Sequence, residues 1–347
     1  PDSQVCGSAL RDRPMRLGSL CTGIAGLDLG LRMAGVETEP VFVSDIDKGA
    51  NDWLAANMPD VPNVGDFTAL NELPDVDIIT AGFPCQPVSM AGQRQGINDE
   101  RWIFDDITRL TSRMGTRPLL FLENVPGLLT ANGGDAMARV VHSLADIGYH
   151  ITWGTLPASA VGTPHRRNRW WGLAYPADTK RFRVGRSPGL DETGGTSFRV
   201  VGRSSTIADT DGARRGGLLV PVESEPEYDR PGQYQPPTSD TESEGLPRAG
   251  GISGRTGPAR HRATPADTDR LGKYADAIVR WEIILGRPAP DPTNDGRLNP
   301  AFVEWMMGYP EDWVCGTLTK RREALHALGN AVVPQCVAVA FTQLTNR

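Results

Sequence analysis

Residues 17–31 read LGSLCTGIAGLDLGL, and this stretch decides the fold. An apolar segment is followed by a turn containing Gly23 and Gly26, and then by leucines at helical spacing. This order predicts a strand, a glycine-bearing turn and a helix, in which the two glycines let the backbone approach a bound ligand. Short glycine-containing turns are common, so the rest of the chain must decide what the turn binds.

Outward from this stretch, short apolar runs alternate with amphipathic segments as far as about residue 175. Such alternation is typical of βαβ units and predicts an α/β domain with a mainly parallel sheet. Strands are predicted at 15–20, 40–44, 76–81, 119–122, 149–156 and 169–175. Helices are predicted between them at 27–33, 50–57, 101–114 and 136–146.

Two of these strands are followed by residues that can carry chemistry. Cys85 lies in GFPCQPVS, between Pro84 and Pro87, and Glu123 and Asn124 lie in FLENVPG. The carboxyl ends of strands are where open α/β sheets bind ligands, so both segments are expected at the ligand-binding edge. A buried structural cysteine is the commoner fate of a lone thiol, and an ordinary polar strand end explains FLENVPG equally well.

Three further segments complete this constellation. VGTPHRRNRWW (161–171) places Arg167 and Arg169 on the same side of an extended chain, where they could bind phosphate, a base carbonyl or a carboxylate; a solvated basic loop is the alternative. VFVSDID ends a strand with Asp45, about 20 residues after the glycine turn, where an acid can bind ribose hydroxyls. The glycine turn, Asp45 and Asp66 in GDFTAL together predict an adenosyl pocket.

Composition limits the class of protein. The chain has 347 residues, of which 39% are hydrophobic, enough for two domains. No run of 18 apolar residues and no signal-peptide pattern is present, so neither a membrane span nor secretion is expected. The five cysteines lack CxxC spacing, so no metal site or redox pair is expected, and their odd number fits a reducing cytoplasm.

Charge is distributed unevenly along the chain. The net charge is −6, but residues 1–160 carry 11 Lys and Arg against 20 Asp and Glu, whereas residues 161–262 carry 16 against 12. A polyanionic partner would therefore meet the middle of the chain, and salt should weaken that contact.

The middle of the chain, from about 176 to 265, is rich in Gly, Pro, Ser, Thr and Arg and has little apolar periodicity. A long linker is one interpretation. The other is a repeated small unit, because an ADT-type motif recurs at near-regular intervals, with its aspartates at Asp178, Asp209, Asp240 and Asp267. Each Asp-Thr could form a local turn or cap.

Regular structure is predicted again near the C-terminus. Residues 271–285 suit a helix, and Asn299 followed by Pro300 should open another. The last segment, ALGNAVVPQCVAVAFTQL, predicts a turn and then an apolar helix that must be buried, most simply against the first domain.

Taken in order, these motifs resemble those of the DNA cytosine-5 methyltransferase family, of bacterial or phage type. The resemblance rests on TGIAGLDLGL, SDID, GDF, GFPCQPVSMAGQ, ENVPGLL, TPHRRNRWW, NPAFVEWMMGYP and LGNAVV, and it spans the chain except its middle. It implies a Rossmann-like S-adenosylmethionine-dependent methyltransferase fold with a smaller target-recognition domain. The catalytic and cofactor-binding domain would comprise 1–175 with 326–347, and the smaller domain, with the ADT-type repeats, would comprise 176–325.

The resemblance also implies roles for individual residues. Cys85 matches the nucleophile, Glu123 the acid that engages the cytosine ring, Asn124 a residue that supports that loop, and Ser89 a hydroxyl near the flipped nucleotide. Arg167 and Arg169 match a basic pair beside the target base. The positions that match the S-adenosylmethionine site are Cys21, Thr22, Gly23, Ile24, Gly26, Asp45, Ile46, Asp66, Phe67, Pro84, Ile103, Asn330 and Ala331.

Several positions depart from the family pattern. Cys21 stands where the family usually has Phe, and Ala25 replaces its middle glycine. Asp45 replaces the usual Glu, Ile46 the aromatic that often follows it, and His165 the Gln of QxRxR. These departures concern cofactor affinity more than the type of reaction.

The implied reaction is methylation of carbon 5 of a flipped cytosine in double-stranded DNA, with S-adenosylmethionine as methyl donor. A monomer in a bacterial or phage-infected cytoplasm is expected, with a restriction endonuclease as a possible partner. Three alternatives stay open: an RNA cytosine-5 methyltransferase, a DNA-binding homologue without activity, and an amino-methyltransferase. The last characteristically uses a (D/N/S)PP(Y/F) loop, which this sequence lacks.

Overall fold

The computed structural model describes residues 13–84, 102–179, 199–203 and 272–346. All of these belong to one compact unit, in which the N-terminal part of the chain and the segments from 272 onward pack together. A second unit, 187–195 with 207–260, lies outside the described residues, as do three of the four repeat aspartates. The division into domains at 175 and 325 therefore stays a prediction.

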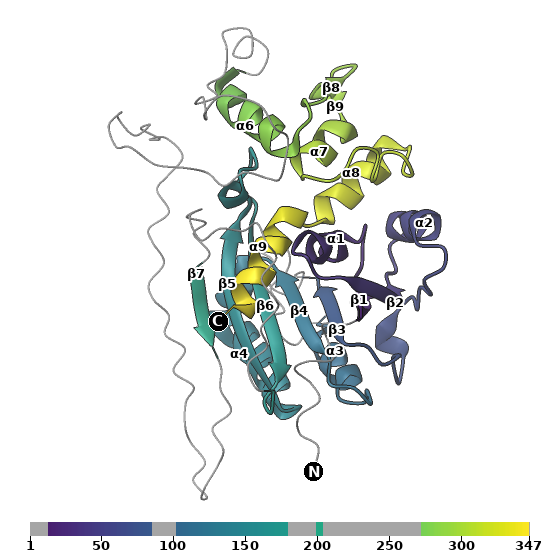
Figure 1. The fold of residues 1–347 in the computed structure, drawn as a ribbon, viewed down its shortest axis with the longest axis vertical. Coiled ribbons are helices and arrows are strands. Elements are labelled where there is room, and N and C mark those ends of the chain that lie inside the picture. Colours follow the sequence, from purple (N-terminus) through teal and green to yellow (C-terminus); the bar gives the residue numbers. More distant parts are fainter. Residues whose placement is uncertain (1–12, 85–101, 180–198, 204–271, 347) are drawn as a thin grey trace, which may run out of the picture. The chain divides into compact units, whose positions relative to one another are not determined.

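The described part contains a seven-stranded sheet with the order β2-β1-β3-β4-β6-β5-β7 (Figure 1). The strands are β1 Met15–Leu20, β2 Thr38–Ser44, β3 Ile78–Gly82, β4 Leu119–Asn124, β5 Tyr149–Pro157, β6 Asn168–Pro176 and β7 Arg199–Arg203. Pairing is parallel from β2 to β4 and antiparallel from β4 to β7. The parallel half brings the ends of four strands to one edge, as the alternating pattern predicted.

Helices cover both faces of the sheet, because alternate residues of each central strand face opposite sides. Phe121 on β4 packs against Phe341 with ring centroids 5.1 Å apart, in the cluster that contains α1 (Gly26–Met33) and α9 (Pro334–Thr345). Its neighbour Leu122 faces the opposite cluster, with residues of α3 (Phe104–Thr111) and α4 (Asp135–Asp146). The remaining helix of this half, α2 (Lys48–Asn57), follows β2.

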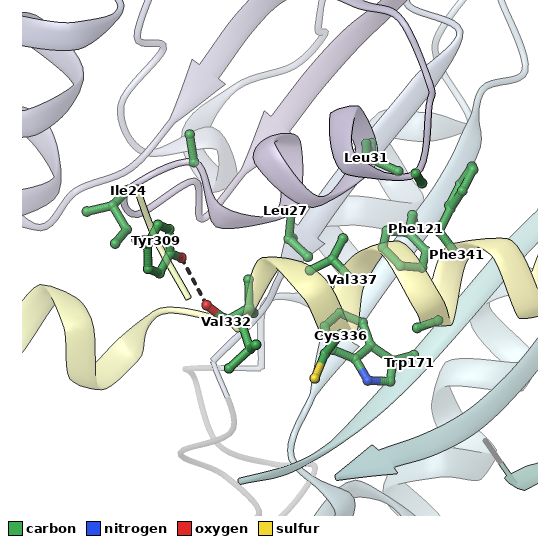
Figure 2. Close-up of a cluster of buried hydrophobic side chains, with 14 of the residues drawn as sticks. Ile24, Leu27, Leu31, Phe121, Trp171, Tyr309, Val332, Cys336, Val337 and Phe341 are labelled. Atoms are coloured by element: carbon green, nitrogen blue, oxygen red, sulfur yellow. Dashed lines mark hydrogen bonds between the residues drawn. The ribbon is translucent and has the colours of Figure 1, made fainter. Parts of the chain in front are cut away.

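The C-terminal helix returns to the first domain, as predicted. Helix α9 packs closely on α1: a Cβ atom added to Gly30 would lie 2.2 Å from Val337. Figure 2 shows Val337 and Phe341 of α9 facing Leu27, Leu31 and Phe121. The C-terminal segment is therefore part of the core on which the N-terminal turn stands.

The C-terminal elements are α6 Ala275–Leu285, β8 Thr293–Asn294, β9 Arg297–Leu298, α7 Pro300–Met306 and α8 Arg321–Asn330. Asn299 caps α7, accepting a hydrogen bond from Ala301 N at 3.1 Å, with Pro300 at its first position as predicted. The turn expected before the last helix is present at residues 331–333, although residues 327–330 of the same segment form the last turn of α8. The sequence Gly-Asn favours a helix end, and the chain does leave the helix, but only after Asn330.

One described stretch, Arg321–Thr345, is long and apolar enough by composition to cross a membrane. It consists of α8 and α9, separated by the non-helical residues 331–333. Of its most apolar window, 56% is buried within the protein, which is the ordinary situation of a core helix.

Candidate active site

A cavity of about 660 Å³ lies at the carboxyl ends of β1, β2, β3 and β4. This volume lies in the range of small-molecule and cofactor sites, roughly 300–1,000 Å³. The segment between α8 and α9 forms another part of the wall. Every residue predicted from the sequence to contact the cofactor lines this cavity: Cys21, Thr22, Gly23, Ile24, Gly26, Asp45, Ile46, Asp66, Phe67, Pro84, Ile103, Asn330 and Ala331.

The loop from β1 to α1 is anchored on the end of β2. Thr22 and Ser44 exchange backbone and side-chain hydrogen bonds: Thr22 N donates to Ser44 O at 3.0 Å, and Ser44 N donates to Thr22 Oγ1 at 3.1 Å. Within this loop Cys21, Gly23 and Ala25 all have positive φ, at 51°, 58° and 54°. Three left-handed residues therefore lie within five positions of the loop, which lines the cavity before α1 begins.

The two glycines of this loop serve different purposes. At Gly23 an added Cβ would meet no atom within 4 Å, and glycine is favoured there by its positive φ. At Gly26 an added Cβ would lie 2.2 Å from Tyr309 Oη and 2.8 Å from Val332 Cγ2. Gly26 therefore makes room for the protein's own C-terminal segment, and because it also lines the cavity, its approach to a ligand stays a prediction.

Asp45 is held in place by backbone amides. Its Oδ2 accepts a hydrogen bond from Gly23 N at 2.7 Å, and its Oδ1 accepts one from Asp47 N at 2.9 Å. Asp47 in turn caps α2 by accepting from Ala50 N at 3.0 Å. The shorter acid thus reaches both the glycine turn and the next helix, and it links two walls of the cavity.

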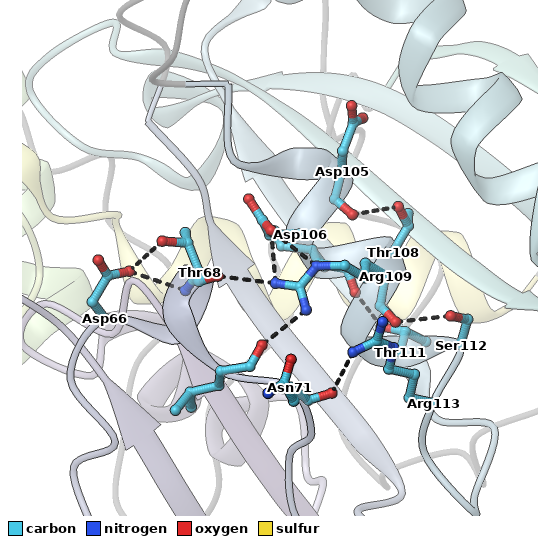
Figure 3. Close-up of polar contacts among 12 residues, drawn as sticks. Asp66, Thr68, Asn71, Asp105, Asp106, Thr108, Arg109, Thr111, Ser112 and Arg113 are labelled. Atoms are coloured by element: carbon cyan, nitrogen blue, oxygen red, sulfur yellow. Dashed lines mark hydrogen bonds and ion pairs between the residues drawn. The ribbon is translucent and has the colours of Figure 1, made fainter.

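The wall around Asp66 is tied to α3. Asp66 accepts hydrogen bonds from Thr68 N at 3.0 Å and Thr68 Oγ1 at 2.6 Å (Figure 3). Arg109 on α3 donates to two carbonyls of this loop at 2.8 and 3.0 Å and pairs with Asp106 at 2.7 Å. A network of charged hydrogen bonds therefore fixes the loop that presents Asp66 and Phe67.

Glu123, at the end of β4, is buried and paired. Its Oε1 lies 2.8 Å from Arg169 Nε, and the two side chains are 11% and 20% exposed. Burial raises the pKa of Glu123, while Arg169 and then Arg167 oppose that rise. The register explains the pairing, because Glu123 on β4 is opposite Trp171 on the antiparallel strand β6, two residues from Arg169.

Arg167 and Arg169 both line the cavity, whereas the preceding residue, Arg166, is exposed and does not. The two lining arginines have different partners. Arg167 Nη2 donates to Gly329 O at 2.8 Å and to Ala331 O at 2.5 Å. Burial, followed by repulsion from Arg169, lowers the pKa of Arg167 to about 10.

Asn124 does not line the cavity. It is buried, and its Nδ2 donates to Phe83 O at 3.2 Å, while its Oδ1 accepts from Val125 N at 2.8 Å. Asn124 therefore joins the end of β4 to the residue before Pro84. That contact fits the supporting role that the resemblance implied.

Two of the departures from the family pattern also have clear surroundings. Cys21 faces Asp45 and Asp66, and burial followed by these carboxylates raises the pKa of its thiol to about 12. His165 contacts Met306 O at 3.2 Å, and burial lowers its pKa, so the imidazole is mainly neutral at neutral pH. Neither side chain supplies a charge to the cavity at neutral pH.

Cavity-lining residues that were not predicted are mostly neighbours of predicted ones: Leu27, Ser44, Asp47, Ala50, Gly65, Thr68, Gly82, Phe83, Val125, Ala327, Gly329 and Val332. Asp47 could have been found from the SDID motif, whose second acid is two residues after Asp45. Tyr309 donates a hydrogen bond to the carbonyl of Val332 in the cavity wall, and no sequence pattern beyond the GYP segment indicates this role.

Cys85 and Ser89, predicted as the nucleophile and as a hydroxyl near the target base, lie outside the described residues. Pro84, which precedes Cys85 in the sequence, lines the cavity. The role of Cys85 therefore stays a prediction that rests on its motif.

Comparison with known proteins agrees with this geometry. The profile of C-5 cytosine-specific DNA methylases matches residues 15–211, more than half of the chain. This chain belongs to that family.

Among its relatives, type II methyltransferase M2.BsuMI of Bacillus subtilis is 36% identical over 160 residues, which are 45% of this chain and 40% of that protein. M.MspI of Moraxella is 35% identical over 173 residues, 49% of this chain and 40% of the relative. The chain thus matches about two fifths of the length of these relatives.

Solved structures support the fold. The Schizosaccharomyces pombe Dnmt2 methyltransferase superposes with a TM-score of 0.54 at 17% identity, covering 96% of this chain and 98% of that one. A methyltransferase encoded within an Escherichia coli prophage gives a TM-score of 0.53 at 18% identity, covering 96% and 100%. The fold of the methylase is therefore the Rossmann-like methyltransferase fold, as predicted.

Proposed function

We propose that this methylase transfers a methyl group from S-adenosylmethionine to carbon 5 of cytosine in double-stranded DNA. One observation carries the proposal: a buried acid paired with an arginine, Glu123 with Arg169, lines the same cavity as the acidic loops of Asp45 and Asp66. The cavity thereby combines acidic loops that suit a cationic cofactor with a buried carboxyl that can engage a nucleobase. Family membership supplies the reaction type.

The cavity suits S-adenosylmethionine by size and charge. Asp45, Asp47 and Asp66 line one side of it and would favour a ligand that carries a sulfonium and an ammonium group. Asp45 and Asp66 are positioned by backbone amides and offer acceptors for hydroxyl groups. When bound there, S-adenosylmethionine supplies an electrophilic methyl group. The loop from β1 to α1, Phe67 and Asn330 would enclose it.

Catalysis in this proposal starts with the thiolate of Cys85, which adds to C6 of the cytosine and makes C5 nucleophilic. Glu123 holds a proton for the ring nitrogen, and burial that raises the pKa of its carboxyl favours the protonated form. Arg169 opposes this by stabilising the carboxylate, so the pair can give up the proton and take it back. After methylation, loss of the C5 proton and departure of Cys85 restore the ring.

The cytosine cannot reach this cavity from within a base stack, so the proposal requires it to flip out of the duplex. The middle of the chain, with its excess of Lys and Arg, is the segment that we expect to contact the DNA. A monomer in a bacterial or phage-infected cytoplasm, with a restriction endonuclease as a partner, remains our prediction. The names of the relatives as type II methyltransferases support this context.

The test is transfer of tritiated methyl to matched DNA and RNA substrates, followed by bisulfite sequencing of the DNA. We expect 5-methylcytosine in DNA at a defined sequence context, and covalent capture of the protein by DNA containing 5-fluorocytosine. Cys85→Ser should abolish both the transfer and the capture. Methylation of RNA alone would select the RNA alternative, and failure of capture with an intact Cys85 would favour a binding protein without activity.

A further inference from the structure

Residues 329–333 comprise the end of α8 and the three non-helical residues that follow it, and we call this stretch the connector. Side chains hold the connector from two directions. Arg167 on the β6 side donates to the carbonyls of Gly329 and Ala331. Tyr309, which follows α7, donates its hydroxyl proton to the carbonyl of Val332 at 2.9 Å (Figure 2). Three carbonyls of this short stretch are thus occupied, and its residues 331–333 have no regular secondary structure of their own.

The connector is a wall of the cofactor cavity. Gly329, Asn330, Ala331 and Val332 all line it. Because three backbone carbonyls of the connector accept hydrogen bonds from side chains, the course of its backbone along the cavity is fixed. An irregular segment without such contacts would lose the geometry that presents Asn330 to a ligand.

The guanidinium of Arg167 is occupied by its contacts with the connector. Both hydrogens of Nη2 are used by connector carbonyls, and Nε is buried without a partner among the described residues. Arg169, two residues further along and within β6, has a different partner, since its Nε pairs with Glu123. The two arginines at the start of β6 therefore contact the two halves of the site separately.

Tyr309 supports the connector from a second side. Its hydroxyl is buried, and the space it fills lies directly above Gly26, where an added Cβ would be only 2.2 Å from Oη. Tyr309 also stacks on Trp313, whose Nε1 donates to Ile24 O at 3.0 Å. Tyr309 thus joins the connector to the turn at the start of α1.

We propose that Arg167 and Tyr309 are positioning residues for the cofactor: they shape the connector, and Arg167 acts on cofactor affinity rather than on the target base. This inference rests on the proposed function, because it assigns residues to the S-adenosylmethionine half of the cavity. It moves Arg167 away from the base-side role that the resemblance implied and leaves that role to Arg169 with Glu123. The low pKa of Arg167 agrees with a guanidinium enclosed by protein.

The test compares Arg167→Met, Arg167→Lys and Tyr309→Phe with Arg166→Met, a matched control whose side chain is exposed and outside the cavity lining. Dissociation constants for S-adenosylhomocysteine are measured by calorimetry without DNA. We expect Arg167→Met to weaken binding about 10-fold or more, which corresponds to about 1.4 kcal/mol. Arg167→Lys should recover part of that loss, Tyr309→Phe should weaken binding by about threefold, and Arg166→Met should leave it unchanged.

Hydrogen exchange and kinetics separate a positioning role from general destabilisation. In the cofactor-free protein, Arg167→Met and Tyr309→Phe should accelerate amide exchange in peptides covering 329–333 while the central strands stay protected. In the methyl-transfer assay Arg167→Met should raise KM for the cofactor by a larger factor than it lowers kcat.

An Arg167→Met variant that binds S-adenosylhomocysteine as tightly as the wild type, with a lower kcat or a higher KM for DNA, would overturn the inference. Exchange accelerated throughout the sheet would do the same, since it indicates global loss of stability. Tight wild-type binding without methylation of any cytosine would contradict the proposed function but leave the positioning role in place. A wild-type chain that does not bind the cofactor would overturn both.

Discussion

Replacing Arg169 with methionine should move the pH dependence of methylation. The substitution removes the charge that lies 2.8 Å from Glu123 and keeps much of the side-chain volume. Burial raises the pKa of Glu123, and the charge of Arg169 is the strongest influence that opposes this rise. Without Arg169 the pKa of Glu123 should rise further, because a buried carboxylate then lacks its nearest counter-charge.

The direction of the shift follows from the role proposed for Glu123. If the protonated carboxyl is required, the rate falls as pH rises through its pKa, so a higher pKa moves the alkaline limb of the pH–rate profile to higher pH. The profile of kcat from tritiated methyl transfer measures this. Arg169→Lys, which keeps a charge, should stay closer to the wild type. An alkaline limb that stays in place or moves to lower pH in Arg169→Met would refute the reasoning.

The same substitution should cost stability. Two unit charges about 4 Å apart attract by about 4 kcal/mol at an effective dielectric constant of 20. Loss of one partner of a buried pair costs about 3–5 kcal/mol, and we expect about 3 because both side chains retain some exposure. The double variant Glu123→Gln with Arg169→Met should recover part of this loss, since no isolated charge remains.

The stability loss itself should depend on pH. For a carboxyl whose pKa is raised on folding, the folded state is favoured at low pH and loses stability as pH rises from the unfolded pKa to the folded pKa. Arg169→Met enlarges that rise, so its extra destabilisation should be small near about pH 5 and larger near about pH 8. Urea unfolding at both values measures the difference. Equal losses at the two pH values would contradict an electrostatic origin.

Three further predictions concern other parts of the site. Asp45→Ala should weaken binding of S-adenosylhomocysteine about 10-fold or more in calorimetry, because it releases Gly23 and removes an acceptor. Gly26→Ala should lower the free energy of unfolding by about 1–3 kcal/mol in urea titrations, because its methyl group would overlap Tyr309, whereas Gly329→Ala, with no atom within 4 Å, should be neutral or stabilising. DNA affinity should fall at least about 10-fold between 50 and 200 mM salt in fluorescence anisotropy, and an affinity independent of salt would contradict phosphate contacts.

Much of this fold was readable from the sequence because local pattern and tertiary structure agree. Strand β1 was predicted with its observed bounds, and the other five predicted strands differ at their ends by no more than two residues. Each predicted strand is short, apolar and bounded by turn residues, so competing interpretations were few. The helix predicted at 101–114 was too long, because α3 occupies only Phe104–Thr111 and the chain then turns.

The polar contacts were harder to predict because they join distant segments. Arg167 and Gly329 of the connector are 162 positions apart in the sequence, and no periodicity predicts a contact between such distant residues. The sequence placed Arg167 at the site but not its partner. Tyr309 was missed altogether, since a buried aromatic behind a wall has the same pattern as any core residue.

The turn between β1 and α1 explains how the departures from the family pattern are tolerated. Cys21 and Ala25 have positive φ values of 51° and 54°, a conformation that costs an L-residue about 1–2 kcal/mol and that glycine would adopt freely. Such strain persists only where the surrounding structure fixes the backbone. Here Thr22 is bound to β2, and Asp45 receives Gly23 N–H. At Ala25 the conformation that a glycine would adopt freely is therefore imposed by contacts, and the loop keeps its shape with Ala25 in place of the glycine and Cys21 in place of the Phe of the family pattern.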